Sequence, residues 1–187
     1  MSAGEIEIAA AILGVINVVL VVRRSTVNYP FGIASVALYF FVFWQAKLYS
    51  DALLQIFFVL IQLYGWWAWV HARQVDHGVA VGWMPWRARA AWMVATGIAI
   101  LIWGTVMARF TDAAAPFVDA TTAGLSVAAQ SLQSLRRVES WLLWITVDLI
   151  AIGLFAWRDL FVTSGLYAIF LILASIGLFE WRRKASA

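Results

Sequence analysis

Apolar segments that are long enough to cross a lipid bilayer follow one another along almost the whole of this chain. A helix needs about 20 mostly apolar residues to span the hydrocarbon core, where only helices and closed barrels satisfy their backbone hydrogen bonds. We therefore expect an all-α integral membrane protein with seven transmembrane helices in a single domain covering residues 1–187. The seven segments are residues 5–22, 28–44, 48–72, 88–108, 116–135, 140–157 and 160–181.

The composition supports this class and excludes several kinds of chemistry. Hydrophobic residues make up 64% of the chain and charged residues only 12%, which is too apolar for an ordinary soluble domain. The chain has no cysteine, so disulfides and thiol catalysis are excluded. His71 and His77 form no metal-binding motif, and no phosphate-binding glycine loop is present. We expect no metal, no cofactor, no enzymatic activity and no nucleic-acid partner.

The positions of the basic residues predict the orientation in the membrane. Cytoplasmic loops of membrane proteins are enriched in Lys and Arg, and here ten of the 13 fall on one side. This distribution places the N-terminus outside and the C-terminus in the cytoplasm, which requires an odd number of helices and so supports the polar segment 116–135. The ten are Arg23, Arg24, Arg73, Arg87, Arg89, Arg136, Arg137, Arg182, Arg183 and Lys184; the other three are Lys47, Arg109 and Arg158.

An internal repeat relates the first three segments, in residues 5–72, to the last three, in residues 116–181. Because three helices reverse the chain direction, segment 88–108 is needed to return the chain so that both units point the same way. We therefore expect a parallel 3+1+3 repeat, an arrangement in which transporters place substrate between the repeats. The matched positions, 112 or 113 residues apart, are Arg23-Arg24 with Arg136-Arg137, Trp44 with Trp157, and Trp69 with Trp181.

One acidic residue, Asp148, lies near the middle of the apolar segment 140–157. A carboxylate at the membrane centre costs about 3 kcal/mol on insertion scales, so it needs a partner. Trp141, Trp144 and Asp148 are spaced so that they share one helix face. The partner is either a substrate or an arginine or tyrosine of a neighbouring helix.

Other segments also carry polar or aromatic side chains inside apolar surroundings, and these predict a shared hydrated cavity because none of them can face lipid cheaply. The alternative is that the amides and hydroxyls only join helices to one another, as they often do in membranes. Tryptophans near segment ends are expected to be membrane-interface anchors instead. The cavity candidates are Tyr39, Gln62, Trp66 and Gln130; the anchor candidates are Trp83, Trp86, Trp92 and Trp181.

Two stretches resemble the PnuC family of vitamin-precursor transporters, namely QLYGWWAW at 62–69 and RRVESWLLWITVDL at the start of 136–181. The resemblance covers nearly the whole chain. It implies a seven-helix, usually trimeric protein of the bacterial inner membrane that passes nicotinamide riboside by facilitated diffusion, with trapping by a cytosolic kinase. It also implies that the ligand-contacting positions are Gln62, Trp66, Trp67, Trp141, Trp144 and Asp148, the last of which often is Asn in the family.

The chemistry of these side chains favours a cationic substrate. Nicotinamide riboside carries a pyridinium charge, which indole rings and a carboxylate attract. We expect Trp66, Trp141 and Trp144 to stack on its base, while Gln62, Gln130 and Asp148 bind its polar groups. Thiamine is also a cation and remains an alternative, whereas neutral riboflavin fits less well. An alternative of another class is a membrane-embedded sensor subunit that binds a ligand without carrying it.

Overall fold

The computed structural model describes residues 3–45, 49–75, 77–111, 115–157 and 161–185. Within these residues all seven predicted helices are present, with ends that differ from the predicted ones by no more than about one turn. Lys47 and Arg158 lie outside the described residues. By length and hydropathy of the described residues, α1, α3, α4 and α7 are apolar and long enough to cross a membrane. The helices are α1 (Ala3–Val22), α2 (Asn28–Gln45), α3 (Tyr49–Val70), α4 (Trp86–Phe110), α5 (Pro116–Ser134), α6 (Glu139–Trp157) and α7 (Phe161–Ala185).

Each of the three prolines of the chain lies at the start of a helix. Pro85 directly precedes α4, Pro116 is the first residue of α5, and Pro30 is the third residue of α2. The first backbone N–H groups of a helix have no acceptor within the helix, so proline, which lacks an N–H, costs nothing there. None of the three prolines therefore lies in the interior of a helix, and the helices can be long and uninterrupted.

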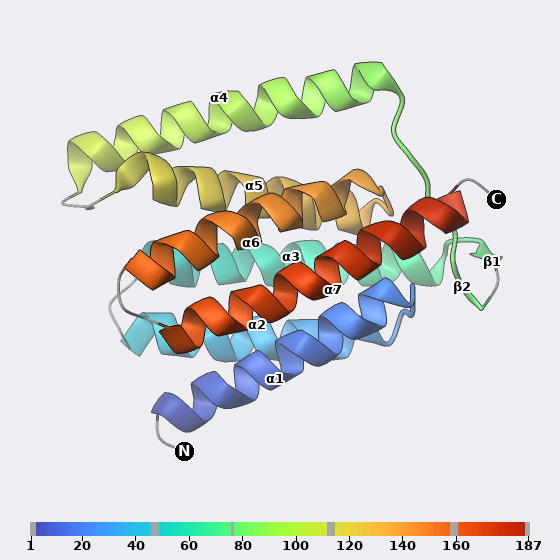
Figure 1. The fold of residues 1–187 in the computed structure, drawn as a ribbon, viewed down its shortest axis with the longest axis horizontal. Helices are drawn as coiled ribbons and strands as arrows, with labels where there is room; N and C mark the ends of the chain where they lie inside the picture. The colour runs from blue at the N-terminus through green and yellow to red at the C-terminus, as the bar shows by residue number, and fades with distance from the viewer. Residues whose placement is uncertain (1–2, 46–48, 76, 112–114, 158–160, 186–187) are drawn as a thin grey trace.

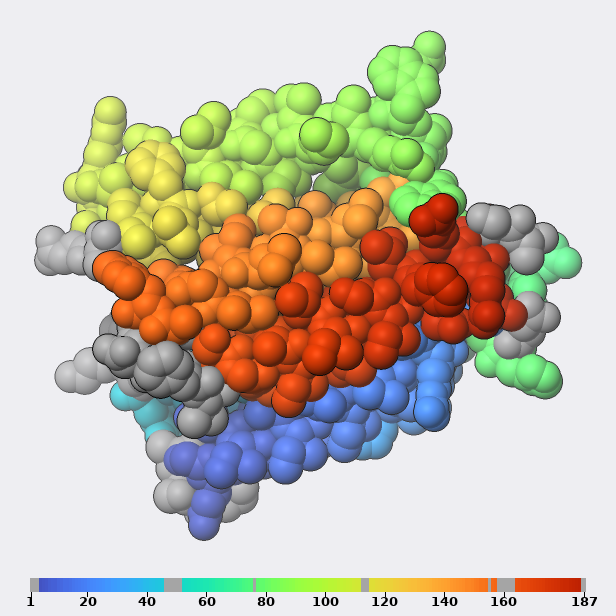
Figure 2. Space-filling view, in the orientation of Figure 1, coloured from blue at the N-terminus to red at the C-terminus, as the bar shows by residue number. Residues whose placement is uncertain are grey.

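Six of the seven described helices form a ring, in which each helix packs against two neighbours. The order around the ring is α1, α2, α3, α5, α6, α7 and back to α1. The helices run along the longest dimension of the molecule, and the two chain ends lie at opposite ends of it (Figure 1). Helix α4 packs mainly against α5 and forms one edge of the molecule, outside the ring (Figure 2).

A short antiparallel hairpin links α3 to α4 at one end of the ring, here named the hairpin end (Figure 1). Its strands are β1 (Gln74–Val75) and β2 (Gly78–Val79). The backbone N–H of Val79 donates to the carbonyl oxygen of Arg24 at 3.2 Å, and the Arg24 guanidinium donates back to the carbonyl of Val79 at 3.3 Å. The sequence analysis did not predict these strands, because two residues are too few to show an alternating pattern.

The segment that follows the hairpin is also tied to the loop between α5 and α6. The N–H of Gly82 donates to the carbonyl oxygen of Arg136 at 3.1 Å, and the carbonyl of Gly82 accepts from Val138 at 3.2 Å. The α3–α4 connection therefore contacts both the loop between α1 and α2 and the loop between α5 and α6.

Buried aromatic rings fill the ring of helices at the hairpin end. Tyr29 of α2 contacts Trp69 of α3 edge to face with ring centroids 5.5 Å apart, and Trp141 of α6 contacts Trp181 of α7 likewise at 5.4 Å. The rings of Trp69 and Trp181 are 5.8 Å apart and join the two pairs. All four side chains are at most 2% exposed, so this cluster forms a solid core.

Two indole hydrogen bonds fix this core to the ends of α5 and α1. The indole N–H of Trp69 donates to the carbonyl oxygens of Gln133 at 3.3 Å and Ser134 at 3.2 Å. The indole N–H of Trp181 donates to the carbonyl of Val21 at 3.2 Å. The last carbonyls of a helix have no partner within the helix, and these indoles supply one. Trp181 is thus fully buried, and the expectation that it anchors the protein at the membrane interface is wrong.

Candidate functional site

Asp148 is buried on α6 with only 3% of its surface exposed. Among the described residues it takes part in no hydrogen bond and no ion pair; the ion pairs found there join Arg89 with Glu139 and Arg183 with Glu180. The described residues therefore do not contain the arginine or tyrosine partner considered above. A buried acid without a partner is costly, which makes Asp148 a candidate for binding a group from outside the chain.

Trp144 lies one turn before Asp148, and α5 fixes its orientation. Its indole N–H donates to the side-chain oxygen Oε1 of Gln133 at 2.6 Å. Gln133 is itself buried, and its backbone carbonyl accepts the hydrogen bond from Trp69 described above. One glutamine thus connects α3, α5 and α6. The ring of Trp144 is only partly buried, so its position is set while part of the indole remains accessible.

Trp141 shares the helix face of Trp144 and Asp148 but is occupied by contacts within the protein. It is 1% exposed, and its ring packs against the backbone of α7 at Gly177 and against Trp181. A Cβ at Gly177 would lie only 2.6 Å from the indole, so glycine is required for this close approach.

On the other side of the ring, two amides meet at Gly32 of α2. Gln62 of α3 is 4% exposed, and its Oε1 lies against Gly32 together with the Oδ1 of Asn17 of α1. The Oδ1 of Asn17 is buried without a hydrogen bond, and no described residue hydrogen-bonds the Gln62 amide. Because α1 and α3 flank α2, side chains from both can meet at a buried position only on the inward face of α2.

The remaining predicted site residues lie apart from these groups. Trp66 stacks on Tyr29, with centroids 6.4 Å apart, whereas its neighbour Trp67 is 61% exposed beside Tyr64 on the outside of α3. Tyr39 stacks on Phe43, about 10 Å further along α2 than Gly32 at 1.5 Å per residue.

Gln130 is half-buried on α5, one turn before Gln133, and forms no hydrogen bond within the described part of the chain. The structure therefore buries Gln62 and Asp148 and leaves Trp144 and Gln130 partly buried. It places Trp67 and Tyr39 away from them, and it surrounds Trp141 with other protein groups.

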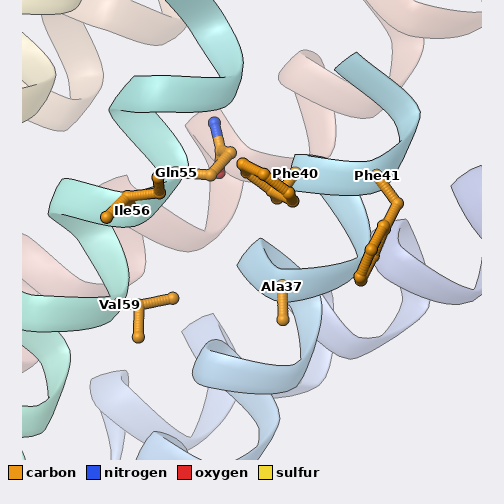
Figure 3. A pocket seen from close by; sticks show the side chains of 6 residues that line it. All are labelled: Ala37, Phe40, Phe41, Gln55, Ile56 and Val59. Carbon is orange, nitrogen blue, oxygen red and sulfur yellow. The ribbon is translucent and has the colours of Figure 1, made fainter. Parts of the chain in front are cut away.

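A separate groove of about 240 Å³ lies between α2 and α3. Figure 3 shows its lining, in which aromatic and aliphatic side chains of the two helices face one another. None of the predicted binding residues lines it. Phe41 and Ile56 are 54% and 44% exposed, so the groove opens to the apolar outside of the bundle. The lining residues are Ala37, Phe40, Phe41, Gln55, Ile56 and Val59.

Comparison with known proteins identifies the family. A family model described as "Nicotinamide mononucleotide transporter" matches residues 5–183. The chain belongs to this family. Relatives of the nicotinamide mononucleotide transporter family include the "Nicotinamide riboside transporter PnuC" of Escherichia coli K12, which is 29% identical over 90% of this chain and 81% of that protein. The membership confirms the resemblance inferred from the sequence motifs.

Other relatives in the family show both the fold and a range of substrates. A solved structure titled "Crystal structure of the Vitamin B3 transporter PnuC" matches with a TM-score of 0.81 and 27% identity, over 97% of this chain and 82% of that chain. The "Riboflavin/roseoflavin transporter RibM" of Streptomyces davaonensis is 26% identical over 79% of this chain and 70% of that protein. Family membership therefore establishes a membrane transport protein, and relatives differ in the vitamin they are named for.

Reasoning from sequence did not show the role of Gln133, and it missed Asn17 of the candidate site. Gln133 lies on the same polar face of α5 as Gln130, but its bond to Trp144 depends on how two helices pack. Asn17 is the single amide in the otherwise apolar interior of α1. Placing an amide inside a membrane helix costs free energy of insertion. A lone amide in an apolar helix could therefore have been identified from the sequence as a candidate.

Proposed function

We propose that this chain is a multi-pass protein of the bacterial inner membrane that carries nicotinamide riboside by facilitated diffusion. The relatives named as nicotinamide riboside transporters support this substrate. The observation that carries the proposal is the buried, unpartnered Asp148 beside the fixed indole of Trp144. A pyridinium ring would gain from both, through attraction to the indole face and to the acid.

The geometry gives the predicted binding residues different roles in this proposal. Trp144 stacks on the base, Asp148 neutralises its charge, and Gln62 hydrogen-bonds polar groups of the substrate. Trp141 supports this face of α6 by packing against α7, and Trp66 stacks on Tyr29. Gln130 is kept as a proposed polar contact, because it lies one turn before Gln133 on α5. We assign no substrate contact to Trp67 or Tyr39, because they lie away from the other groups.

In the membrane, we propose that all seven helices span the bilayer and that residues 1–187 form one transmembrane domain. The alternating helix directions and the opposite positions of the two chain ends support an odd number of spans (Figure 1). The basic residues Arg182, Arg183 and Lys184 lie in the last turn of α7, at the hairpin end with Arg24 and Arg136. By the positive-inside rule this end is cytoplasmic, so the N-terminus is outside.

We further propose the parallel 3+1+3 repeat, with residues 5–72 and 116–181 as the repeats and the linker helix at 88–108. The contacts in the ring support it, because exchanging the two repeats leaves the order of neighbours unchanged. Matching contacts also recur 112 residues apart, which pairs Arg24 with Arg136 and not with Arg137 as the sequence comparison does. These are the hydrogen bonds Trp69–Gln133 and Trp181–Val21, the edge-to-face pairs Tyr29–Trp69 and Trp141–Trp181, and the positive φ angles of Arg24 (58°) and Arg136 (60°).

The family resemblance adds two further elements to the proposal. The protein assembles as a homotrimer, and it is functionally linked to a cytosolic kinase. Facilitated diffusion stops when the concentrations on the two sides are equal, so net uptake needs a reaction that removes the substrate inside. Phosphorylation would do so, because it gives the substrate negative charge that a buried acid such as Asp148 repels.

Uptake of labelled nicotinamide riboside into liposomes that contain the purified protein tests the transport proposal. We expect the label to reach equal concentrations inside and outside, without an ion gradient or ATP, and empty liposomes are the control. Uptake of thiamine or riboflavin but not nicotinamide riboside would show that the protein is a transporter but that nicotinamide riboside is not its substrate. Saturable binding without equilibration across the bilayer would indicate a ligand-binding or sensor subunit instead.

A further inference from the structure

The amides of Asn17 and Gln62 form a polar pair on the inward face of α2, at the one position where that helix has no side chain. Both amide oxygens lie against Gly32, and a Cβ there would collide with Gln62 and lie 2.7 Å from the Oδ1 of Asn17. We propose that Asn17 and Gln62 together bind the ribose hydroxyls of the substrate and that Gly32 leaves the room for them. This inference rests on the proposed function.

The hydrogen-bonding capacity of this amide pair exceeds what the protein satisfies. Two amides offer two acceptor oxygens and four N–H donors. In either orientation of the amides, one hydrogen bond between them leaves most of these donors and acceptors without a partner. The described residues supply no hydrogen bond to the Oδ1 of Asn17 or to the Gln62 amide. Adjacent hydroxyl groups, each both donor and acceptor, are the chemical class that fits such a pair.

The position of the amide pair relative to Trp144 would let one substrate contact both, with its base at Trp144 and its ribose at the amides. At the 112-residue spacing of the matching contacts, the counterpart of Gly32 is Trp144, so Gly32 and the indole lie at the same depth on opposite sides of the ring. One half of the ring thus offers an aromatic surface for the base, and the other offers two amides for the sugar. The counterparts of Asn17 and Gln62 are the buried small residues Ala129 and Ala174.

The first experiment compares nicotinamide riboside with its 2′,3′-dideoxy analogue, measuring the affinity of the purified protein for each by calorimetry. We expect the wild type to bind the analogue about tenfold more weakly, because two hydrogen bonds are lost. In Asn17→Leu, which keeps the side-chain shape without the amide, the preference for nicotinamide riboside should shrink to a few-fold, because only Gln62 remains to bind the hydroxyls. An unchanged preference in Asn17→Leu would overturn the inference.

The second experiment tests the space at Gly32 with a matched pair of glycine substitutions. Gly32→Ala should weaken binding of nicotinamide riboside at least tenfold, because the new methyl group displaces the two amides. Gly153→Ala is the control, since a Cβ at Gly153 would meet no atom within 4 Å. Thermal unfolding of both variants separates loss of binding from loss of folding, and a folded Gly32→Ala protein that binds normally would contradict the proposal.

The two experiments keep failure of the inference apart from failure of the proposed function. If the wild type binds neither compound, nicotinamide riboside is not the substrate and the inference fails with the proposed function. If the wild type binds both equally well, the substrate stands but its hydroxyls are not recognised, and only the assignment of the amide pair is rejected. If Gly32→Ala does not fold, the comparison in Asn17→Leu alone decides.

Discussion

At the scale of single residues, the sequence predicted which side chains share a face of α6 but not what each of them contacts. Trp141, Trp144 and Asp148 do lie on one face, as their spacing requires. Yet Trp141 packs on α7, Trp144 is hydrogen-bonded by α5, and Asp148 has no partner among the described residues. Spacing along one helix cannot distinguish these outcomes, because each depends on a residue of another helix.

Asp148→Asn should leave the protein folded and weaken its binding of the cationic substrate about tenfold or more. No described residue depends on the acid for an ion pair, so its replacement leaves no buried charge unpaired, whereas the substrate loses a charge-assisted contact. Binding of nicotinamide riboside and thermal unfolding should be measured together. Asp119→Asn on α5 is the matched control and should change neither. A less stable Asp148→Asn protein with unchanged affinity would show that the acid has a structural role.

At the scale of helices, the sequence predicted the elements well because most are long apolar runs with polar or proline-containing ends, and the polar helix α5 followed from the odd helix count that the charge distribution requires. It did not predict the hairpin, whose two-residue strands are stabilised by bonds to Arg24 rather than by their own pattern. Nor did it predict that Trp69 and Trp181 are buried partners. Their indoles hold α3 to α5 and α7 to α1, the two contacts that close the ring.

Trp69→Phe and Trp181→Phe should each lower the free energy of unfolding by about 1 kcal/mol or more, because each removes an indole N–H and leaves helix-end carbonyls without a partner. Thermal unfolding in detergent measures the effect. Trp157→Phe is the control, since Trp157 is 76% exposed. If only one of the two buried substitutions were destabilising, the two contacts would not be equivalent and the proposed repeat would lose its main support.

At the scale of the whole molecule, charge counting gives a predicted orientation that awaits a test, whereas the order of helices around the ring could not be read from the chain. That order depends on which faces fit together, and it places α5 beside α3 while α4 stays outside. The same packing brings residues of α1, α2 and α3 together at Gly32, which is why Asn17 escaped notice in the sequence.

The absence of cysteine from the sequence makes the orientation directly testable. Gly4→Cys at the start of α1 should react with a membrane-impermeant maleimide added to intact cells. Gln74→Cys in the exposed strand β1 should react only after the cells are opened. Neither substitution removes a described hydrogen bond of a side chain. The reverse pattern of labelling would show that the protein is inserted the other way round.

The two indole bonds of Trp69 and Trp181 also bear on how a passage through the protein could open. Both bonds join helices of different repeats, and both lie at the hairpin end. Separating the repeats at that end breaks both bonds and exposes four large rings, whereas separating them at the opposite end leaves these bonds intact and lets this end act as a hinge. In the conformation described here, the four buried rings and the two indole bonds therefore close the hairpin end, and we expect a solute to pass this end only after both bonds break.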